Sequence, residues 1–246
     1  MSMRELRQLT EHVDHQHREA MRTIHDDLGE LHLSHQDDAV VANRRNFVRN
    51  LGLGGAAIAF GSLLVPVAGL VPDALAQTAT GADVPAADMA IIKFAQGLEL
   101  AAVAAYVAIV AQRKLDTPQT ESARLFGRHH TEHSDALAKL IPKADIATVA
   151  NPKILAVFQP QITAATDANA LMQVAFNLES GAAATYQLAM GALSNWQGAA
   201  AVATIEPIEA QHAVVWGQAL DLPIDQWMPA FQSSAAALQP STYAAS

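Results

Sequence analysis

The chain reads Gly97-Leu-Glu99-Leu-Ala-Ala-Val-Ala-Ala-Tyr106 in one place and Asn177-Leu-Glu179-Ser-Gly-Ala-Ala-Ala-Thr-Tyr186 in another, and each stretch holds one carboxylate in an otherwise apolar run. Each stretch is followed by a pair of polar residues at three-residue spacing. His130-Thr-Glu-His133 begins 31 residues after the first glutamate, and Glu209-Ala-Gln-His212 begins 30 residues after the second. This repeated pattern is typical of a metal site inside a four-helix bundle.

The two isolated glutamates need a compensating positive charge if their helices are buried. A carboxylate buried in an alanine- and leucine-rich helix costs several kcal/mol unless a partner compensates its charge. Neither Glu99 nor Glu179 has a basic residue within one helical turn. Residues three apart on a helix lie on one side, so each pair can contact one metal ion or two adjacent ions. Beyond residue 77, three of the four histidines fall on the repeated positions.

The pattern of apolar residues and proline predicts four long helices, at about residues 86–114, 118–141, 167–193 and 197–220, with Asp167 as the N-cap of the third. The links within each pair are short enough for helical hairpins. Between the pairs, residues 142–166 contain Pro152 and Pro160, and we expect these prolines to interrupt a long crossover along the bundle. Pro207 requires a kink in the fourth helix or a late start.

Composition limits which other kinds of site, partner and domain the chain can have. The chain has 246 residues, a net charge of −9 and no cysteine, so disulfides and iron–sulfur clusters are excluded. We expect no nucleic-acid partner, because no basic stripe accompanies the acidic balance. Residues 77–246 are long enough for one bundle domain. Homo-oligomerisation is left open by the sequence.

Residues 43–76 resemble a twin-arginine export signal. Arg44-Arg45 and Phe47 precede a weakly hydrophobic run from Leu51 to Val71. Ala74-Leu-Ala76 then matches the small-residue pattern of a signal cleavage site. The resemblance implies passage through the twin-arginine export machinery, cleavage after Ala76 and a periplasmic or other extracytoplasmic location. The alternatives are a retained membrane anchor, which would tether the protein, and a buried hairpin.

Residues 1–42 form an extension ahead of this signal. Its apolar residues recur at roughly helical spacing, and it contains six histidines. We favour a solvated amphipathic helix, or a start assigned too far upstream, over a metal-sensing or metal-delivering tail, because no single helical face collects the histidines.

The two glutamates and the two pairs at three-residue spacing resemble the metal-ligand positions of the ferritin-like superfamily. Members of this superfamily have an all-α fold, an antiparallel four-helix bundle with a long crossover between its second and third helices. The resemblance covers about residues 85–220 and is nearest to bacterial twin-arginine-exported members and desiccation-related proteins. It implies a di-iron or di-manganese site. Its metal ligands would be Glu99, His130, His133, Glu179, Glu209 and His212, with no catalytic residues beyond them.

His130 departs from the family pattern. In the superfamily, its position carries the second bridging glutamate, whereas Glu209 matches the first bridge. Replacing a bridging carboxylate with an imidazole leaves less negative charge between two cations, so a mixed or weakened pair of ions, or a single ion, are all compatible with the sequence. Glu132 would need a helix rotation of about 100° to substitute. We expect His129 outside the ligand set or at the bundle surface.

Three further residues are candidates for a layer around the ligands. Tyr106 and Tyr186 each follow a ligand glutamate by seven residues, almost two turns, and so share its face. They could hydrogen-bond a ligand or carry an electron hole, although a core tyrosine with a satisfied hydroxyl is the commoner case. Glu206, one turn before Glu209, is either a supporting acid or a charge near the helix start.

Two classes of function follow. The first is an oxidative-stress enzyme, an oxidase, peroxidase or catalase-like protein whose iron or manganese ions react with oxygen or peroxide. The second is a non-catalytic stress or desiccation-related structural protein with a partial metal site. A convergent ligand set reached by a solvent channel favours the first, whereas carboxylates paired with the site histidines in a closed interior favour the second.

Overall fold

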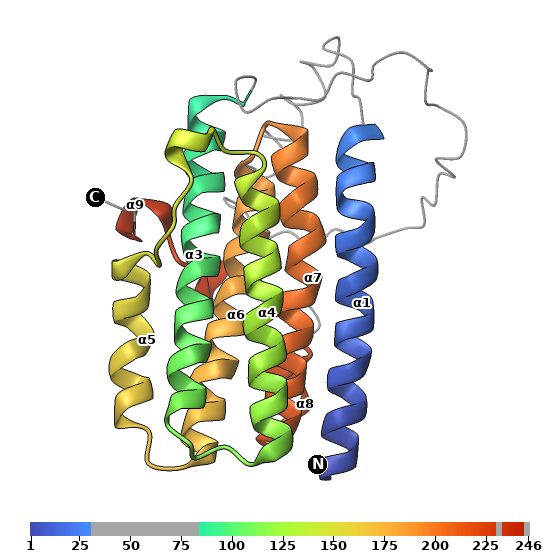
Figure 1. Cartoon of the computed structure of the whole chain (residues 1–246), viewed down its shortest axis with the longest axis vertical. Coiled ribbons are helices and arrows are strands. Elements are labelled where there is room, and N and C mark those ends of the chain that lie inside the picture. Colours follow the sequence, from blue (N-terminus) through green and yellow to red (C-terminus); the bar gives the residue numbers. More distant parts are fainter. Residues whose placement is uncertain (31–83, 230–232, 244–246) are drawn as a thin grey trace, which may run out of the picture.

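Four long helices form the body of the molecule (Figure 1). The computed structural model describes residues 1–30, 84–229 and 233–243, and all regular elements in these ranges are helices. The body consists of α3 (Ala86–Ala111), α4 (Thr117–Ala138), α6 (Ala168–Ala192) and α7 (Trp196–Ala219). The four predicted helices are therefore confirmed, with ends that differ from the predicted ones by up to three residues.

Side-chain caps fix where three of these helices begin. The carboxylate of Asp116 accepts a hydrogen bond from the backbone N–H of Gln119, whose side chain accepts one in return from the Asp116 N–H. Asp167 caps α6 as predicted, and Asn195 caps α7. Such caps satisfy backbone donors that have no partner within the helix, and each stabilises a helix start by about 1 kcal/mol.

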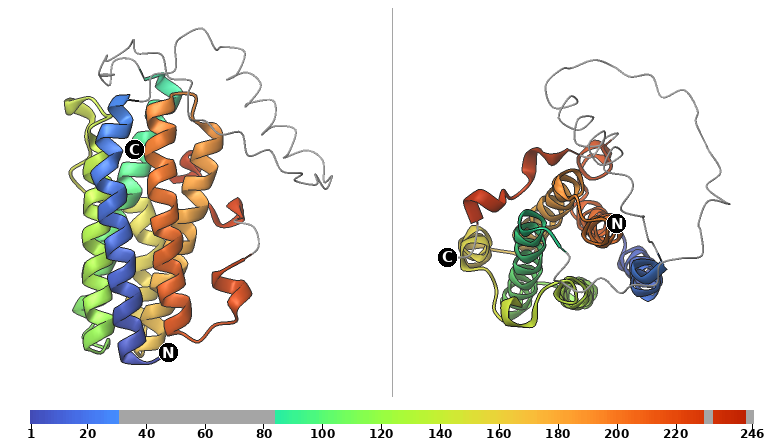
Figure 2. Two further views of the ribbon diagram at one scale, coloured as in Figure 1. Left: turned by 90° about the vertical axis from the view of Figure 1, so that its right-hand side faces the viewer. Right: turned by 90° about the horizontal axis from the view of Figure 1, so that it is seen from above.

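The helices pair as two antiparallel hairpins, α3 with α4 and α6 with α7 (Figure 2). Alanines at the contact faces of the helices are buried, which allows close approach of the backbones. Buried Asp88 at the start of α3 accepts hydrogen bonds from the Ser194 backbone and hydroxyl, at 2.8 and 2.9 Å, in the turn between α6 and α7. The start of the first hairpin is thereby joined to the turn of the second.

The long crossover between the hairpins is confirmed, but its prolines do not keep it irregular. Helix α5 (Pro152–Ala164) begins at Pro152 because a proline in the first turn has no N–H to leave unpaired, and Asn151 caps it. Pro160 lies inside α5, and Pro207 lies inside α7, which continues through it. Ile154, Phe158 and Ile162 bury one face of α5, which packs on α3 and α6.

A fifth long helix, α1 (Met3–Glu30), lies along α7 and α4 (Figures 1 and 2). We expected this segment to be solvated, but its apolar stripe is buried against the bundle: Leu6 and Val13 are 4% and 2% exposed. Each such side chain contributes about 1.5–3 kcal/mol when fully buried. The predicted export signal, residues 43–76, lies outside the described residues.

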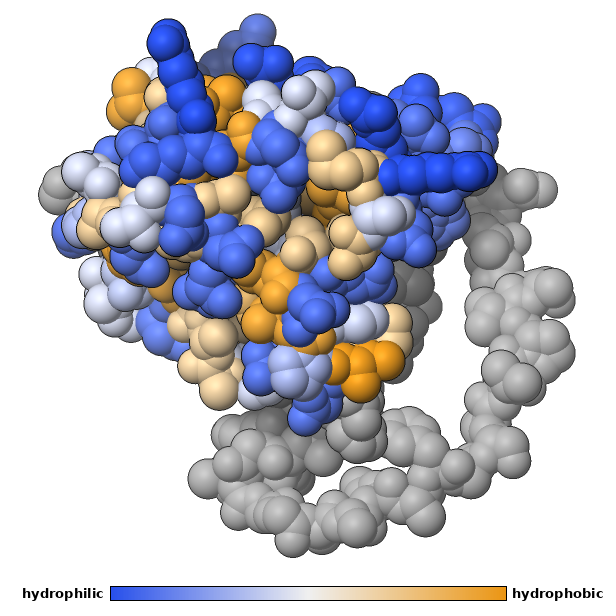
Figure 3. Space-filling view, turned by 90° about the horizontal axis from the view of Figure 1, so that it is seen from below, coloured by the Kyte–Doolittle hydropathy of each residue, from blue (hydrophilic) through white to orange (hydrophobic). Residues whose placement is uncertain are grey.

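Short elements follow α7 along the bundle: α8 (Ile224–Trp227), η3 (Ser234–Ala236) and α9 (Pro240–Tyr243). One end of the molecule, seen in Figure 3, intersperses apolar with polar residues where it is not grey. Among the described residues, one helix, Ala86–Ala111, is long and apolar enough to cross a membrane. Most of that helix is buried in the bundle, where it carries Glu99, as expected of a core helix.

Candidate metal centre

The structure brings all six predicted ligand residues together in the middle of the bundle. Each of the four core helices contributes: one glutamate from α3, two histidines from α4, one glutamate from α6, and a glutamate and a histidine from α7. All six side chains are fully buried. Antiparallel packing places the mid-helix positions at one level, and this arrangement unites residues more than 100 positions apart in the sequence.

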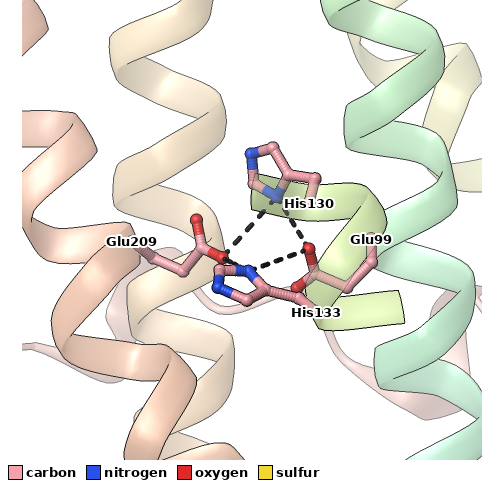
Figure 4. Close-up of side chains that lie close together, drawn as sticks. All are labelled: Glu99, His130, His133 and Glu209. Carbon is pink, nitrogen blue, oxygen red and sulfur yellow. Dashed lines mark hydrogen bonds and ion pairs between the residues drawn. The ribbon is translucent and has the colours of Figure 1, made fainter. Parts of the chain in front are cut away.

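One group of four residues is shown in Figure 4: Glu99, His130, His133 and Glu209. His130 Nδ1 lies 2.7 Å from Glu99 Oε2 and 3.6 Å from Glu209 Oε1. His133 Nδ1 lies 2.8 Å from the same Glu209 oxygen and 3.5 Å from Glu99 Oε2. The Nδ1 atoms of both histidines therefore face the same two carboxylates.

A second group of four comprises His130, Glu179, Glu209 and His212. His212 Nδ1 lies 3.3 Å from Glu179 Oε2 and 3.3 Å from Glu209 Oε2. His130 turns its other nitrogen, Nε2, to within 3.2 Å of Glu179 Oε1. The two groups overlap at His130 and Glu209, and each holds nitrogen and oxygen donors close enough together to coordinate one ion.

The cluster carries strong mutual electrostatic effects. Burial alone would lower the pKa of His133, but the Glu209 and Glu99 carboxylates outweigh it and raise that pKa to about 9. In the same way, the surrounding carboxylates raise the pKa values of His130 and His212 above the ordinary value for histidine. Protonated histidines therefore compensate the carboxylates when no cation is bound.

The glutamates show the complementary effect. Burial alone would raise the pKa of Glu99, but His130 and His133 outweigh it and lower that pKa to about 2. The pKa of Glu179 is held well below its ordinary value, because His130 and His212 outweigh burial. Both carboxylates are ionised at neutral pH, which is the state that coordinates metal.

Glu209 supplies the test of whether a metal fits. Neither of its oxygens forms a hydrogen bond with any described residue, although both are buried. His133 Nδ1, only 2.8 Å away, also lacks a hydrogen bond, because the approach has the wrong direction for one. A buried carboxylate without donors is costly, and a cation between it and the neighbouring nitrogens would remove that cost. The donor set therefore fits a pair of divalent ions.

The comparison with protein families agrees with this geometry. The model of the ferritin-like domain matches residues 87–222, more than half of the chain. The chain belongs to the ferritin-like domain family. Comparisons with curated proteins and with solved structures found no match.

The two predicted tyrosines of this ferritin-like domain contact the candidate ligands Glu99 and Glu179 reciprocally. Tyr106, on the first hairpin, donates a hydrogen bond to Glu179 on the second, and Tyr186 donates one to Glu99. Trp216 Nε1 donates to the Tyr106 hydroxyl at 2.8 Å. Burial and the neighbouring carboxylates raise the pKa of both tyrosines well above the ordinary value, so both remain neutral donors. The hydroxyls hold the glutamates in place.

The remaining sequence candidates lie farther out. Glu206 is half-buried, and burial followed by the charge of Glu209 raises its pKa, but no hydrogen bond or ion pair joins it to the cluster among the described residues. His129 is buried rather than at the surface, and its Nδ1 lies 3.0 Å from His212 Nε2. Glu132 points away from the six and lies 2.9 Å from a histidine of α1.

That histidine, His17, is the residue that the sequence did not single out. It is fully buried between α1 and the ferritin-like bundle, stacked on His129 with ring centroids 3.8 Å apart and set edge-on to His133 at 4.9 Å. Burial, together with the nearby site histidines, lowers its pKa to about 2 and also lowers that of His129, so both rings are neutral. A signal was available: His17 follows Leu6 and Val13 on the stripe that the bundle buries.

Proposed function

We propose that this ferritin-like protein is exported, binds two iron or manganese ions and reacts with oxygen or peroxide. One observation carries the proposal: two overlapping buried Glu/His groups share Glu209, whose carboxylate has no hydrogen-bond donor among the described residues. A carboxylate in both groups is the bridge that two neighbouring cations need, because its negative charge offsets their repulsion.

The donors indicate the class of metal. Three carboxylates and three imidazoles form a mixed oxygen and nitrogen set, which suits iron and manganese and contains none of the sulfur ligands that select copper(I). Glu99 and His133 would hold one ion, Glu179 and His212 the other, with Glu209 between them. His130 presents one nitrogen to Glu99 and the other to Glu179, and so would lie beside both ions. Bound iron or manganese would supply electron transfer to a small oxidant.

The chain's own residues would hold and shield this chemistry. Tyr106 and Tyr186 fix the terminal glutamates through hydrogen bonds from opposite hairpins. Phe126 stacks on His212 with ring centroids 4.1 Å apart and covers that ligand with apolar surface. A buried, largely apolar surround of this kind would limit access to small molecules and keep reactive species from the bulk solvent.

A second candidate is the non-catalytic stress or desiccation-related protein. The ion pairs that join His130 to Glu99 and Glu179 favour it, because they neutralise buried carboxylates without a metal. Under this alternative, the metal-free bundle is the working form, and its role is structural.

Export is proposed from residues 43–76, whose sequence resembles a twin-arginine signal. Cleavage after Ala76 would leave α1 attached to the bundle only through its packing against α4 and α7. Intact mass measurement of the protein from its native compartment, under native and denaturing conditions, separates three outcomes: a retained signal, a cleaved chain with α1 still bound, and a cleaved chain without α1.

Elemental analysis of the purified protein tests the proposed function, with Glu209→Ala and Glu206→Ala in parallel. The control variant removes a glutamate one turn earlier on the same helix, outside both ligand groups. We expect about two equivalents of iron or manganese in the parent and in Glu206→Ala, and a loss from Glu209→Ala. Metal-dependent consumption of oxygen or peroxide would then establish the enzyme. No bound transition metal in a folded parent would contradict the metal centre and favour the structural alternative.

A further inference from the structure

Helix α1 brings two side chains to the outer side of the ligand histidines. Asp14 and His17 both belong to this helix, which lies outside the matched family domain at residues 87–222. Asp14 contacts His129, and His17 contacts Glu132. These contacts form two chains of side chains, each running from a ligand histidine to a partly exposed carboxylate.

The first chain begins at His212. Its Nε2 lies 3.0 Å from His129 Nδ1, and His129 Nε2 lies 3.2 Å from Asp14 Oδ1. An ionised carboxylate can only accept hydrogen bonds, so the proton of neutral His129 resides on Nε2. His129 Nδ1 must then accept a hydrogen bond from His212 Nε2–H. When a bound cation displaces the proton on His212 Nδ1, this tautomer leaves Nδ1 with a lone pair directed toward Glu179 and Glu209, where the metal would bind.

The second chain begins at His133. His17 Nε2 lies 2.9 Å from Glu132 Oε2, so the proton of neutral His17 also resides on Nε2, and its Nδ1 is an acceptor. That Nδ1 and His133 Nε2 are both buried and have no hydrogen-bond partner among the described residues. Their rings meet edge-on with centroids 4.9 Å apart, and a proton on His133 Nε2 would make the two unpaired atoms a complementary donor and acceptor. A proton on His133 Nε2 leaves Nδ1 free to coordinate beside Glu209 and Glu99.

Simple docking would not require this arrangement. An apolar side chain would pack α1 as well as His17 does, whereas a fully buried imidazole costs free energy unless its nitrogens are used. Asp14 is held in place by an ion pair with Arg18 at 2.9 Å, one turn along α1. Asp14 Oδ1 faces His129, and the ring of His17 stacks on His129 and lies edge-on to His133.

We propose that Asp14 and His17 are positioning residues of the metal centre, which fix the tautomers and ring orientations of His212 and His133 from a fifth helix. This inference rests on the proposed function, since it requires the two histidines to bind metal through Nδ1. Partners of this kind raise ligand basicity, and their loss typically lowers metal affinity by about 10–100-fold.

The test uses the full chain, with Co²⁺ as the probe. Titration followed by visible absorption gives the affinity, and NMR of the Co²⁺ protein shows the exchangeable ring protons of coordinated histidines. We expect Asp14→Ala to weaken Co²⁺ binding by about 10–100-fold and to speed the exchange of the His212 Nε2 proton. His17→Leu should do the same for His133. Asp14→Asn and His17→Gln keep an acceptor and should recover part of the affinity.

Two control variants weaken the packing of α1 without touching a histidine chain. Val13→Ala removes buried apolar contact, and Thr10→Val removes the hydrogen bond of 2.8 Å to Ser122 on α4. Site-specific changes in proton exchange for Asp14→Ala and His17→Leu, absent from both controls, support positioning. If the parent binds Co²⁺ and all four variants behave alike, positioning is contradicted while the metal centre stands. If the folded parent binds no Co²⁺, both proposals are contradicted.

Discussion

The two hairpins of the bundle carry the same arrangement with one substitution. Each supplies a glutamate, a tyrosine seven residues later and a pair at three-residue spacing on its second helix. Each tyrosine donates to the glutamate of the other hairpin. The difference is His130 in the first hairpin where the second has Glu209. This substitution shows that the fold can keep a site's geometry while changing its charge.

The consequence of the substitution is visible in the hydrogen bonds. His130 hydrogen-bonds both terminal glutamates, at 2.7 and 3.2 Å, and so satisfies acids of both hairpins. Glu209, at the corresponding position, has no hydrogen-bond partner among the described residues. At this one position, therefore, the first hairpin supplies a partner for the neighbouring glutamates, whereas the second supplies a further carboxylate. We expect metal binding to depend more strongly on Glu209 than on His130.

Among changes that compare the two hairpins, the largest expected effect comes from removing Glu99 or Glu179. If the hairpins are equivalent in this respect, Glu99→Ala and Glu179→Ala should each reduce the bound metal from about two equivalents to about one, because each glutamate belongs to only one ligand group. Elemental analysis measures the stoichiometry, and circular dichroism confirms that the helices remain. Loss of both ions from one variant and of none from the other would break the equivalence.

Replacing His130 with glutamate makes the two hairpins alike. A second bridging carboxylate offsets cation repulsion, so His130→Glu should raise affinity for the second Mn²⁺ ion by about tenfold or more. Without metal, the same variant should be less stable, because four buried carboxylates would face only two ligand histidines. Calorimetric titration and thermal unfolding with and without Mn²⁺ measure the two effects. Equal or weaker Mn²⁺ affinity would show that an imidazole serves at this position as well as a carboxylate.

The tyrosines differ in one partner. Tyr106→Phe leaves the indole N–H of Trp216 without its acceptor, whereas Tyr186→Phe removes only the bond to Glu99. An unpaired buried donor costs about 1–3 kcal/mol, so we expect Tyr106→Phe to lower the free energy of unfolding by that much more than Tyr186→Phe. Denaturant unfolding measures the difference. The double variant Tyr106→Phe with Trp216→Phe should recover stability relative to the additive sum, and strict additivity would contradict the coupling.

The sequence predicted the bundle well because its signals were local and repeated. The cap at Asp167, the apolar runs and the repeated Glu and Glu/His-x-x-His positions each depend on neighbours within a turn or two. The sequence also placed the six ligand candidates on facing helices. The structure unites them, although their role as ligands stays a prediction.

What the sequence missed depends on packing between distant segments. The stripe of α1 was visible, but nothing local indicates that it meets α4 and α7, so His17 could not be distinguished from exposed His12 and His15. The second wrong prediction concerned the prolines of the crossover. Pro152 and Pro160 were expected to interrupt the crossover, but the first begins α5, and burial of Ile154, Phe158 and Ile162 on α3 and α6 stabilises the turns around the second.

The two outer helices differ in their expected response to pH. Apolar residues hold α5 on α3 and α6, whereas α1 places His17 against His129, His133 and Glu132 of α4, near His212 of α7 and one turn from its own Asp14. Docked His17 has a pKa lowered to about 2, and on an undocked, solvated helix the value returns to about 6.5. Between these two pKa values, His17 is therefore protonated when α1 is undocked and neutral when α1 is docked.

Docking of α1 is then at full strength above pH 6.5 and weakens as the pH falls, by up to about tenfold for each unit below that value. Hydrogen exchange of α1 and α5 peptides between pH 7 and pH 5, corrected for the intrinsic rate, measures both helices in one sample. We expect protection of α1 to fall with pH while that of α5 holds, and His17→Leu to flatten the response of α1. If protection of α1 depends on pH equally strongly in His17→Leu, groups other than His17 cause the acid sensitivity, because leucine cannot bind a proton.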